Sequence, residues 1–84
     1  MLKITLQGVG NPDFSQWADV APERTINVET IEEAAKEASA YIDEYDLGGG
    51  NWTDPYVLNE QGEKVARIFY NGRIALPGDE YFNL

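Results

Sequence analysis

Two segments near the start of the chain alternate between hydrophobic and polar residues. In residues 2–7 every second side chain is apolar, which is the pattern of a strand with one buried face. Residues 24–28 show the same alternation at Ile26 and Val28. We therefore predict two strands that pair in antiparallel fashion, joined by a loop.

A helical period begins at Ile31. Thr30 and Glu33 form a capping box, in which the threonine hydroxyl accepts from the Glu33 amide and the glutamate reaches back to the Thr30 amide. Apolar residues then recur at spacings of three and four, at Ile31, Ala34, Ala35, Ala38, Tyr41, Ile42 and Tyr45. The pattern predicts a helix that runs to about Tyr45, and we expect residues 48–50, three glycines, to supply the left-handed cap that ends it.

The second half of the chain favours strands again. Residues 52–59 predict a third strand, and Pro55 confines that strand to a sheet edge or takes one of its first positions. Residues 59–62, Asn-Glu-Gln-Gly, have the composition of a turn, and residues 63–70 predict a fourth strand. The chain therefore ends in a meander of strands.

A tight hairpin is the strongest local signal in this half. Asn71-Gly72 favours a type I′ turn, because both central positions of that turn need positive φ. The turn should join the fourth strand to a last strand at residues 73–75. Residues 79–84 then remain as a short acidic and aromatic tail.

The order of these elements is ββαβββ, and it predicts the fold class. A chain of 84 residues can enclose one hydrophobic core, so we expect a single domain over residues 1–84. We predict an α+β fold of two layers, with one helix packed on an antiparallel sheet of four or five strands.

The composition argues against several classes of function. The chain has no cysteine and no histidine, so it lacks a thiolate nucleophile, a Cys/His zinc site and an imidazole proton carrier. We expect no catalytic residue, no metal site, no cofactor and no enzymatic activity. No apolar stretch approaches the roughly 20 residues that cross a bilayer, and residues 1–5 lack the apolar segment of a signal peptide. We therefore expect a soluble, cytoplasmic protein.

The charge is large and unevenly distributed. Fifteen acidic and six basic residues give a net charge of −9, which disfavours direct binding to nucleic acid or to an anionic membrane. Residues 23–46 hold eight carboxylates against Arg24 and Lys36, a net charge of −6, whereas residues 55–78 have a net charge of +1. The sequence thus predicts a molecule with two electrostatically different sides.

The acidic residues around the predicted helix have two interpretations. Glutamates on an exposed helix side favour helix formation and keep a protein soluble. Alternatively, a row of carboxylates on a rigid scaffold attracts a basic groove on a partner protein. On this hypothesis the partner-binding residues are seven carboxylates with two aromatic anchors from the tail: Glu29, Glu32, Glu33, Glu37, Asp43, Glu44, Asp46, Tyr81 and Phe82. Trp17 and Trp52 are further candidate anchors.

Two sequence segments carry a resemblance. Asp46-Leu-Gly-Gly-Gly-Asn-Trp52 and Val65-Ala-Arg-Ile-Phe-Tyr-Asn-Gly-Arg73 resemble segments of small uncharacterised proteins encoded in bacterial, plasmid and phage genomes. That resemblance implies no catalytic residue. In size, acidity and architecture the chain is also similar to phage-encoded inhibitors of host defence, including anti-CRISPR proteins. This likeness implies a partner whose basic surface belongs to a nucleic-acid-binding complex.

Two alternatives from other classes remain open. A small ligand-binding domain or enzyme could use the glycine-rich loop at residues 48–50 with nearby tyrosine, arginine and carboxylate side chains, and a deep pocket near Trp52 and Arg67 would favour it. A structural module could instead associate with copies of itself through the exposed edge of its last strand. The sequence leaves the oligomeric state open.

Overall fold

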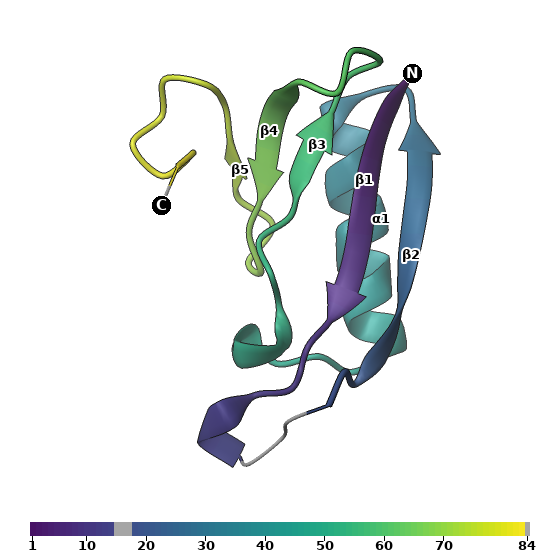
Figure 1. Cartoon of the computed structure of the whole chain (residues 1–84), viewed down its shortest axis with the longest axis vertical. Coiled ribbons are helices and arrows are strands. Elements are labelled where there is room, and N and C mark those ends of the chain that lie inside the picture. Colours follow the sequence, from purple (N-terminus) through teal and green to yellow (C-terminus); the bar gives the residue numbers. More distant parts are fainter. Residues whose placement is uncertain (15–17, 84) are drawn as a thin grey trace.

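The computed structural model describes residues 1–14 and 18–83. Within them, one helix packs on one face of a five-stranded antiparallel sheet, as Figure 1 shows. The sheet has the order β2-β1-β3-β4-β5. Its members are β1 (Leu2–Gly8), β2 (Ala21–Val28), β3 (Tyr56–Leu58), β4 (Lys64–Ile68) and β5 (Ile74–Ala75), and the helix is α1 (Ile31–Glu44). The predicted α+β class and the element order ββαβββ are confirmed.

The two N-terminal strands pair as their alternation predicts. Ile4 of β1 lies opposite Ile26 of β2, and on its other side opposite Val57 of β3. Strand β2 is longer than the predicted segment, because the register shifts after Leu6 and the pairing continues to Ala21. β2 forms one edge of the sheet, where its proline is tolerated.

The helix begins as predicted, with one change in its cap. Thr30 Oγ1 accepts a hydrogen bond from the Glu33 amide at 3.0 Å, which satisfies one of the free donors of the first turn. The Glu33 carboxylate accepts from the amide of Glu29 at 2.9 Å, so the predicted return bond to Thr30 is wrong by one residue. The reciprocal capping therefore reaches one residue further back along the chain.

The predicted end of the helix is also wrong in detail. Asp46 takes the left-handed conformation, with φ of 50°, and the amide of Leu47 donates to the carbonyl of Ile42 at 3.0 Å. This is the hydrogen bond of a Schellman motif, and it lies ahead of the glycines. The first of them, Gly48, has an ordinary φ of −89°. Aspartate tolerates the left-handed region better than most residues, so the helix ends without a glycine.

The glycine-rich loop instead allows a close approach between two loops. Gly49–Asn51 forms a short 3-10 helix, η2. A Cβ atom on Gly50 would lie 2.1 Å from Asn11 Nδ2, so only glycine fits at this position. Beside it, Asn51 Nδ2 donates to the carbonyl of Val9 at 2.8 Å, and the Val9 amide donates to the carbonyl of Asn51 at 3.0 Å. We call this contact the loop clasp.

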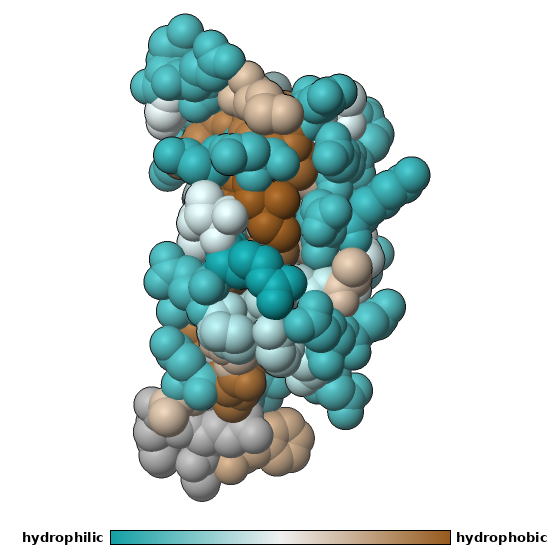
Figure 2. All heavy atoms as spheres, turned by 90° about the vertical axis from the view of Figure 1, so that its right-hand side faces the viewer, coloured by the Kyte–Doolittle hydropathy of each residue, from teal (hydrophilic) through white to brown (hydrophobic). Residues whose placement is uncertain are grey.

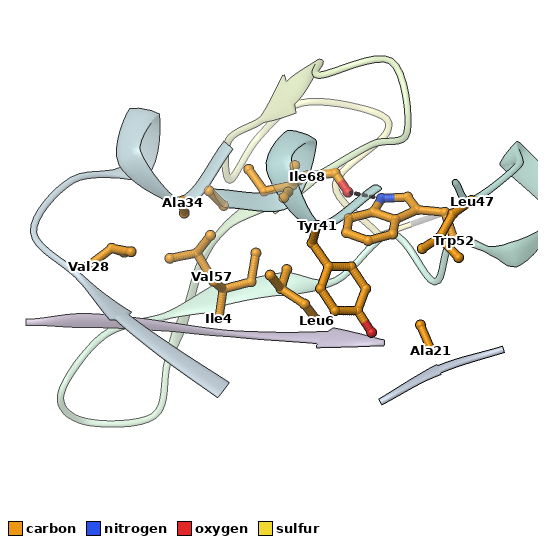
Figure 3. Packing of buried hydrophobic residues seen from close by; sticks show 12 residues of the cluster. Ile4, Leu6, Ala21, Val28, Ala34, Tyr41, Leu47, Trp52, Val57 and Ile68 are labelled. Carbon is orange, nitrogen blue, oxygen red and sulfur yellow. Dashed lines mark hydrogen bonds between the residues drawn. The ribbon is translucent and has the colours of Figure 1, made fainter. Parts of the chain in front are cut away.

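The core lies between α1 and the sheet (Figure 3). Ala34, Ala38 and Tyr41 are the buried residues of the helix, and the two alanines let its backbone approach the strands closely. The strands contribute fully buried aliphatic side chains, each worth about 1.5–3 kcal/mol on burial: Ile4, Leu6, Val28, Val57 and Ile68. Trp52 closes one end of the core, with its indole N–H donating to the carbonyl of Ile68 at 3.1 Å.

The predicted hairpin between β4 and β5 is present, but its turn type is not the predicted one. The Gly72 amide donates to the Phe69 carbonyl at 2.9 Å, and the Phe69 amide donates to the Arg73 carbonyl at 3.0 Å. Gly72 has a φ of 87°, whereas Asn71 is not in the left-handed region. These bonds define a three-residue loop that ends in a left-handed glycine, so the type I′ prediction is wrong.

The third strand is central in the sheet. Pro55 directly precedes β3, so it removes no donor from the ladder. Its carbonyl accepts from the Ile68 amide at 3.0 Å, which extends the pairing with β4 by one bond. The expected strand from residue 52 therefore shortens to Tyr56–Leu58.

The segment after β5 folds back onto the face of the sheet that α1 leaves open. Phe82 is 8% exposed, and its ring packs edge-to-face on Tyr56 with 5.4 Å between the centroids. The Tyr56 hydroxyl donates to the carbonyl of Phe82 at 2.6 Å. The expected tail is thus tied to the sheet at Phe82. In the described part of the chain, no helix has the length and apolar character needed to cross a bilayer.

Candidate protein-binding surface

The seven predicted carboxylates gather around α1. Glu29 directly precedes the helix cap and Asp46 follows the helix, while the other five lie within it. At 3.6 residues per turn, Glu32 and Asp43 lie opposite the buried alanines of α1, while the other three acidic positions lie along one flank of the helix. Six of the seven are exposed and Glu37 is partly exposed. We call this set the acidic face: Glu29, Glu32, Glu33, Glu37, Asp43, Glu44 and Asp46.

Figure 2 shows the molecule from the β2 side, with hydrophilic atoms on both flanks and apolar patches between them that hydrophilic side chains interrupt. Partly buried side chains from the seam between β2 and α1 include Ile26, Ile31 and Ile42. The seam separates the acidic face from the open face of the sheet. The carboxylates of the acidic face and the charged residues of the open face therefore lie on opposite sides of this seam.

One carboxylate of the acidic face is neutralised within the described residues. Arg24 Nη2 lies 3.3 Å from Glu44 Oε2, and both side chains are about half exposed, at 41% and 51%. Arg24 also donates to the Tyr45 hydroxyl at 3.0 Å, and its guanidinium lies over the Tyr41 ring at 5.5 Å. The hydrogen bond from Arg24 lowers the pKa of Glu44.

The other six carboxylates have no ion pair with a described lysine or arginine. Lys36 is the one basic residue of α1, and it too has no carboxylate within 4.0 Å among the described residues. Nor does this part of the chain gather three carboxylates closely enough to hold a metal ion. The arrangement is an extended row of exposed anions along a helix about 21 Å long.

The basic residues of the second half of the chain lie elsewhere, against aromatic rings. Lys64 Nζ is 4.3 Å from the centre of the Tyr56 ring, and the guanidinium of Arg67 is 4.9 Å from the same ring. Arg73 lies 4.3 Å from the centre of the Tyr81 ring and 3.4 Å from Asp79. Tyr56 belongs to the open face, so Lys64 and Arg67 are held across the sheet from α1.

The predicted aromatic anchors lie in different parts of the structure. Tyr81 is exposed, but it lies beside the β4–β5 hairpin and not on the acidic face. Phe82 is buried against Tyr56, and Trp52 is buried in the core at 6% exposure. Trp17 lies outside the described residues. The structure thus places none of the described anchors among the carboxylates of α1, because Trp52 lies in the core and the C-terminal segment returns along the opposite layer.

A depression lies between the glycine-rich loop and the β4–β5 hairpin, beside the loop that the ligand-binding alternative names. It is open to solvent and has a volume of about 420 Å³. We call it the hairpin pocket, and its lining residues are Gly49, Asp54, Phe69, Tyr70, Asn71, Arg73 and Tyr81. The sequence pointed to this loop and to tyrosine, arginine and carboxylate partners, but it placed them around Trp52 and Arg67, which do not line the pocket.

Asp54 is the carboxylate of the hairpin pocket. Its backbone is in the left-handed region, with φ of 50°, and its carbonyl accepts from Arg67 Nε at 2.9 Å. Partial burial raises the pKa of the Asp54 carboxyl, and the nearby charge of Arg67 opposes that shift. The ring of Tyr70 forms another wall of the pocket. Its hydroxyl donates to the carbonyl of Leu47 at 2.9 Å, which holds the ring in place.

Comparison with protein-family models, with curated proteins and with solved structures found no match. The described geometry offers two surfaces for recognition: the row of carboxylates on α1, and the pocket of aromatic rings around Asp54.

Proposed function

We propose that this chain is a non-enzymatic binding protein whose acidic face docks on a basic surface of a partner protein. The partner surface is one that otherwise binds nucleic acid, so that docking blocks it in the manner of an anti-CRISPR-type inhibitor. The proposal concerns protein–protein recognition, without a cofactor and without direct contact to nucleic acid or membrane.

One observation supports the proposal above the others. Six carboxylates of the acidic face have no ion pair in the described structure, whereas Lys64, Arg67 and Arg73 are held by aromatic rings or by Asp79. Unpaired anions on a helix repel one another, and they attract a partner that carries complementary charge. A face that served only solubility would not need them concentrated on one helix.

The experiment is affinity capture from a bacterial lysate at low and at high salt, with two matched charge variants. Glu37→Lys/Asp43→Lys reverses two charges of the acidic face and leaves its N-terminal cap intact. We avoid Glu33, because its carboxylate accepts from the Glu29 amide. Glu23→Lys/Glu80→Lys makes the same change in net charge at exposed sites outside the acidic face.

The expected result is recovery of a nucleic-acid-binding protein by the wild type at low salt and its loss at high salt, because screening weakens exposed charge pairs. The control variant should retain capture, the acidic-face variant should lose it, and duplex DNA should compete for the captured protein. Equal capture by both variants would refute the proposal.

Self-association is the outcome that would favour the structural-module alternative. Its predicted contact, the edge of the last strand, offers only the two residues of β5, whereas β2 at the other edge has eight. A mass that rises with protein concentration, together with capture of this chain alone, would support that alternative in place of a heterologous partner.

A further inference from the structure

We propose that the hairpin pocket receives an arginine side chain of the partner protein, held between its aromatic walls and the Asp54 carboxylate. This inference rests on the proposed function, because it supplies the acidic face with an anchor. It assigns to the pocket a ligand class, a planar cation, that the acidic face alone does not specify.

The first argument is the state of Asp54. Its carboxylate accepts no hydrogen bond and forms no ion pair within the described residues, although the side chain is partly buried. The neighbouring Arg67 donates its Nε hydrogen to the Asp54 backbone carbonyl and not to the carboxylate. A partly desolvated carboxylate without a partner favours a cation that brings its own hydrogen-bond donors.

The second argument is the aromatic lining of the pocket. Phe69, Tyr70 and Tyr81 line the pocket, and aromatic faces attract guanidinium groups. The chain itself shows that two of these rings accept a guanidinium, since Arg73 lies 4.3 Å from the centre of the Tyr81 ring and Arg67 lies 5.4 Å from the centre of the Phe69 ring. Tyr70 is held in place through its hydroxyl, so its ring is preorganised before a ligand arrives.

The third argument is charge. Arg73 is the one basic residue that lines the pocket, and its guanidinium already faces Asp79 at 3.4 Å. That pairing leaves Asp54 without an ion pair among the lining residues, and the nearby charge of Arg67 compensates it only in part. An anionic ligand would have to overcome both Asp54 and the net charge of −9, whereas a cation is attracted by both.

The fourth argument is position. Tyr70 bonds to the carbonyl of Leu47, which directly follows Asp46 of the acidic face, and Gly49 lines the pocket two residues further on. The pocket therefore adjoins the C-terminal end of the acidic face. A basic partner lying along α1 would carry cationic side chains past its opening. Arginine, tryptophan and tyrosine are enriched among the residues that dominate interface energy.

The test is an NMR titration of the whole chain at physiological salt with N-acetyl-L-arginine amide. N-acetyl-L-citrulline amide serves as its neutral isostere. We expect saturable shifts at Gly49, Tyr70 and Asn71, with at least about fivefold weaker binding of the citrulline probe. Asp54→Asn should weaken the arginine probe at least about fivefold. It preserves the backbone, because asparagine tolerates the left-handed region as aspartate does.

The outcomes separate this inference from the proposed function. Absence of saturation, equal binding of citrulline, or equal binding by Asp54→Asn would overturn the pocket assignment and leave the acidic face untouched. Glu37→Lys/Asp43→Lys should still bind the arginine probe within about twofold, since salt screens distant charges. If probe binding depends on Asp54 but partner capture is unchanged in Glu37→Lys/Asp43→Lys, the pocket assignment stands and the proposed docking through the acidic face is refuted.

Discussion

The acidic face and the open face of the sheet carry opposite charges in opposite surroundings. On the open face, Tyr56 alone faces two cations, Lys64 at 4.3 Å and Arg67 at 4.9 Å. On the acidic face, Arg24 compensates Glu44, and the described residues offer no cation to the remaining carboxylates. Lys64 and Arg67 are therefore held within the molecule, whereas most carboxylates of the acidic face have no cation beside them in the described residues. Changes on the open face should cost stability, and changes on the acidic face should chiefly cost binding.

The largest effect on stability should come from removing the Phe82 ring, which covers Tyr56 on the open face. Phe82→Ala takes away a ring that packs on Tyr56, and truncating a buried phenylalanine costs about 3–5 kcal/mol. Urea unfolding measures the loss, with Tyr81→Ala as the neighbouring control at an exposed ring. If the two variants lost equal stability, the C-terminal segment would not be part of the packed structure.

On the acidic face, a substitution should raise the free energy of unfolding instead of lowering it. Asp43 lies in the last turn of α1, where the partial negative charge of the helix end disfavours a carboxylate. Asp43→Lys should raise the free energy of unfolding by about 0.3–1 kcal/mol while weakening partner capture. Lys36→Glu is the opposite change on the same helix and should lower stability. A destabilised Asp43→Lys variant would mean that this carboxylate has a structural role.

The smallest effect should be the pH dependence of stability that comes from Glu44, the carboxylate of the acidic face that pairs with Arg24. Arg24 lowers the pKa of Glu44 in the folded state below its unfolded value, so the pair adds stability above the unfolded pKa. That contribution is lost as pH falls through the lowered folded pKa. The urea midpoint of Glu44→Gln should lie below that of the wild type at pH 7, and the two midpoints should converge in acid. A constant difference across that range would assign the effect to packing.

The sequence predicts the elements whose signal is local. The alternation around Ile4 and Ile26 and the stripe through Tyr41 locate two strands and the helix, because a buried face needs its own periodicity. The acidic face follows from the same stripe, since carboxylates between the apolar positions must point outward. For these features the chemistry of each segment determines its place in the fold.

Features made by distant segments escaped sequence reasoning. Phe82 looks like part of a free tail until Tyr56, distant in sequence, is placed beneath it. The hairpin pocket combines side chains from the glycine-rich loop, Asp54, the β4–β5 turn and Tyr81, which only the completed sheet brings together. The helix end was misassigned for a local reason, since Asp46 adopts a conformation that glycine normally supplies.

The loop clasp decides how the molecule can meet a partner. Asn51 and Val9 exchange two hydrogen bonds, and Gly50 packs so closely on Asn11 that the three glycines cannot act as a hinge. The clasp joins both ends of a segment that contains β2 and α1, so the helix cannot swing away from the strands without breaking it. Under the proposed function, a partner would meet a surface that is already ordered, and association would not bear the entropy of ordering it.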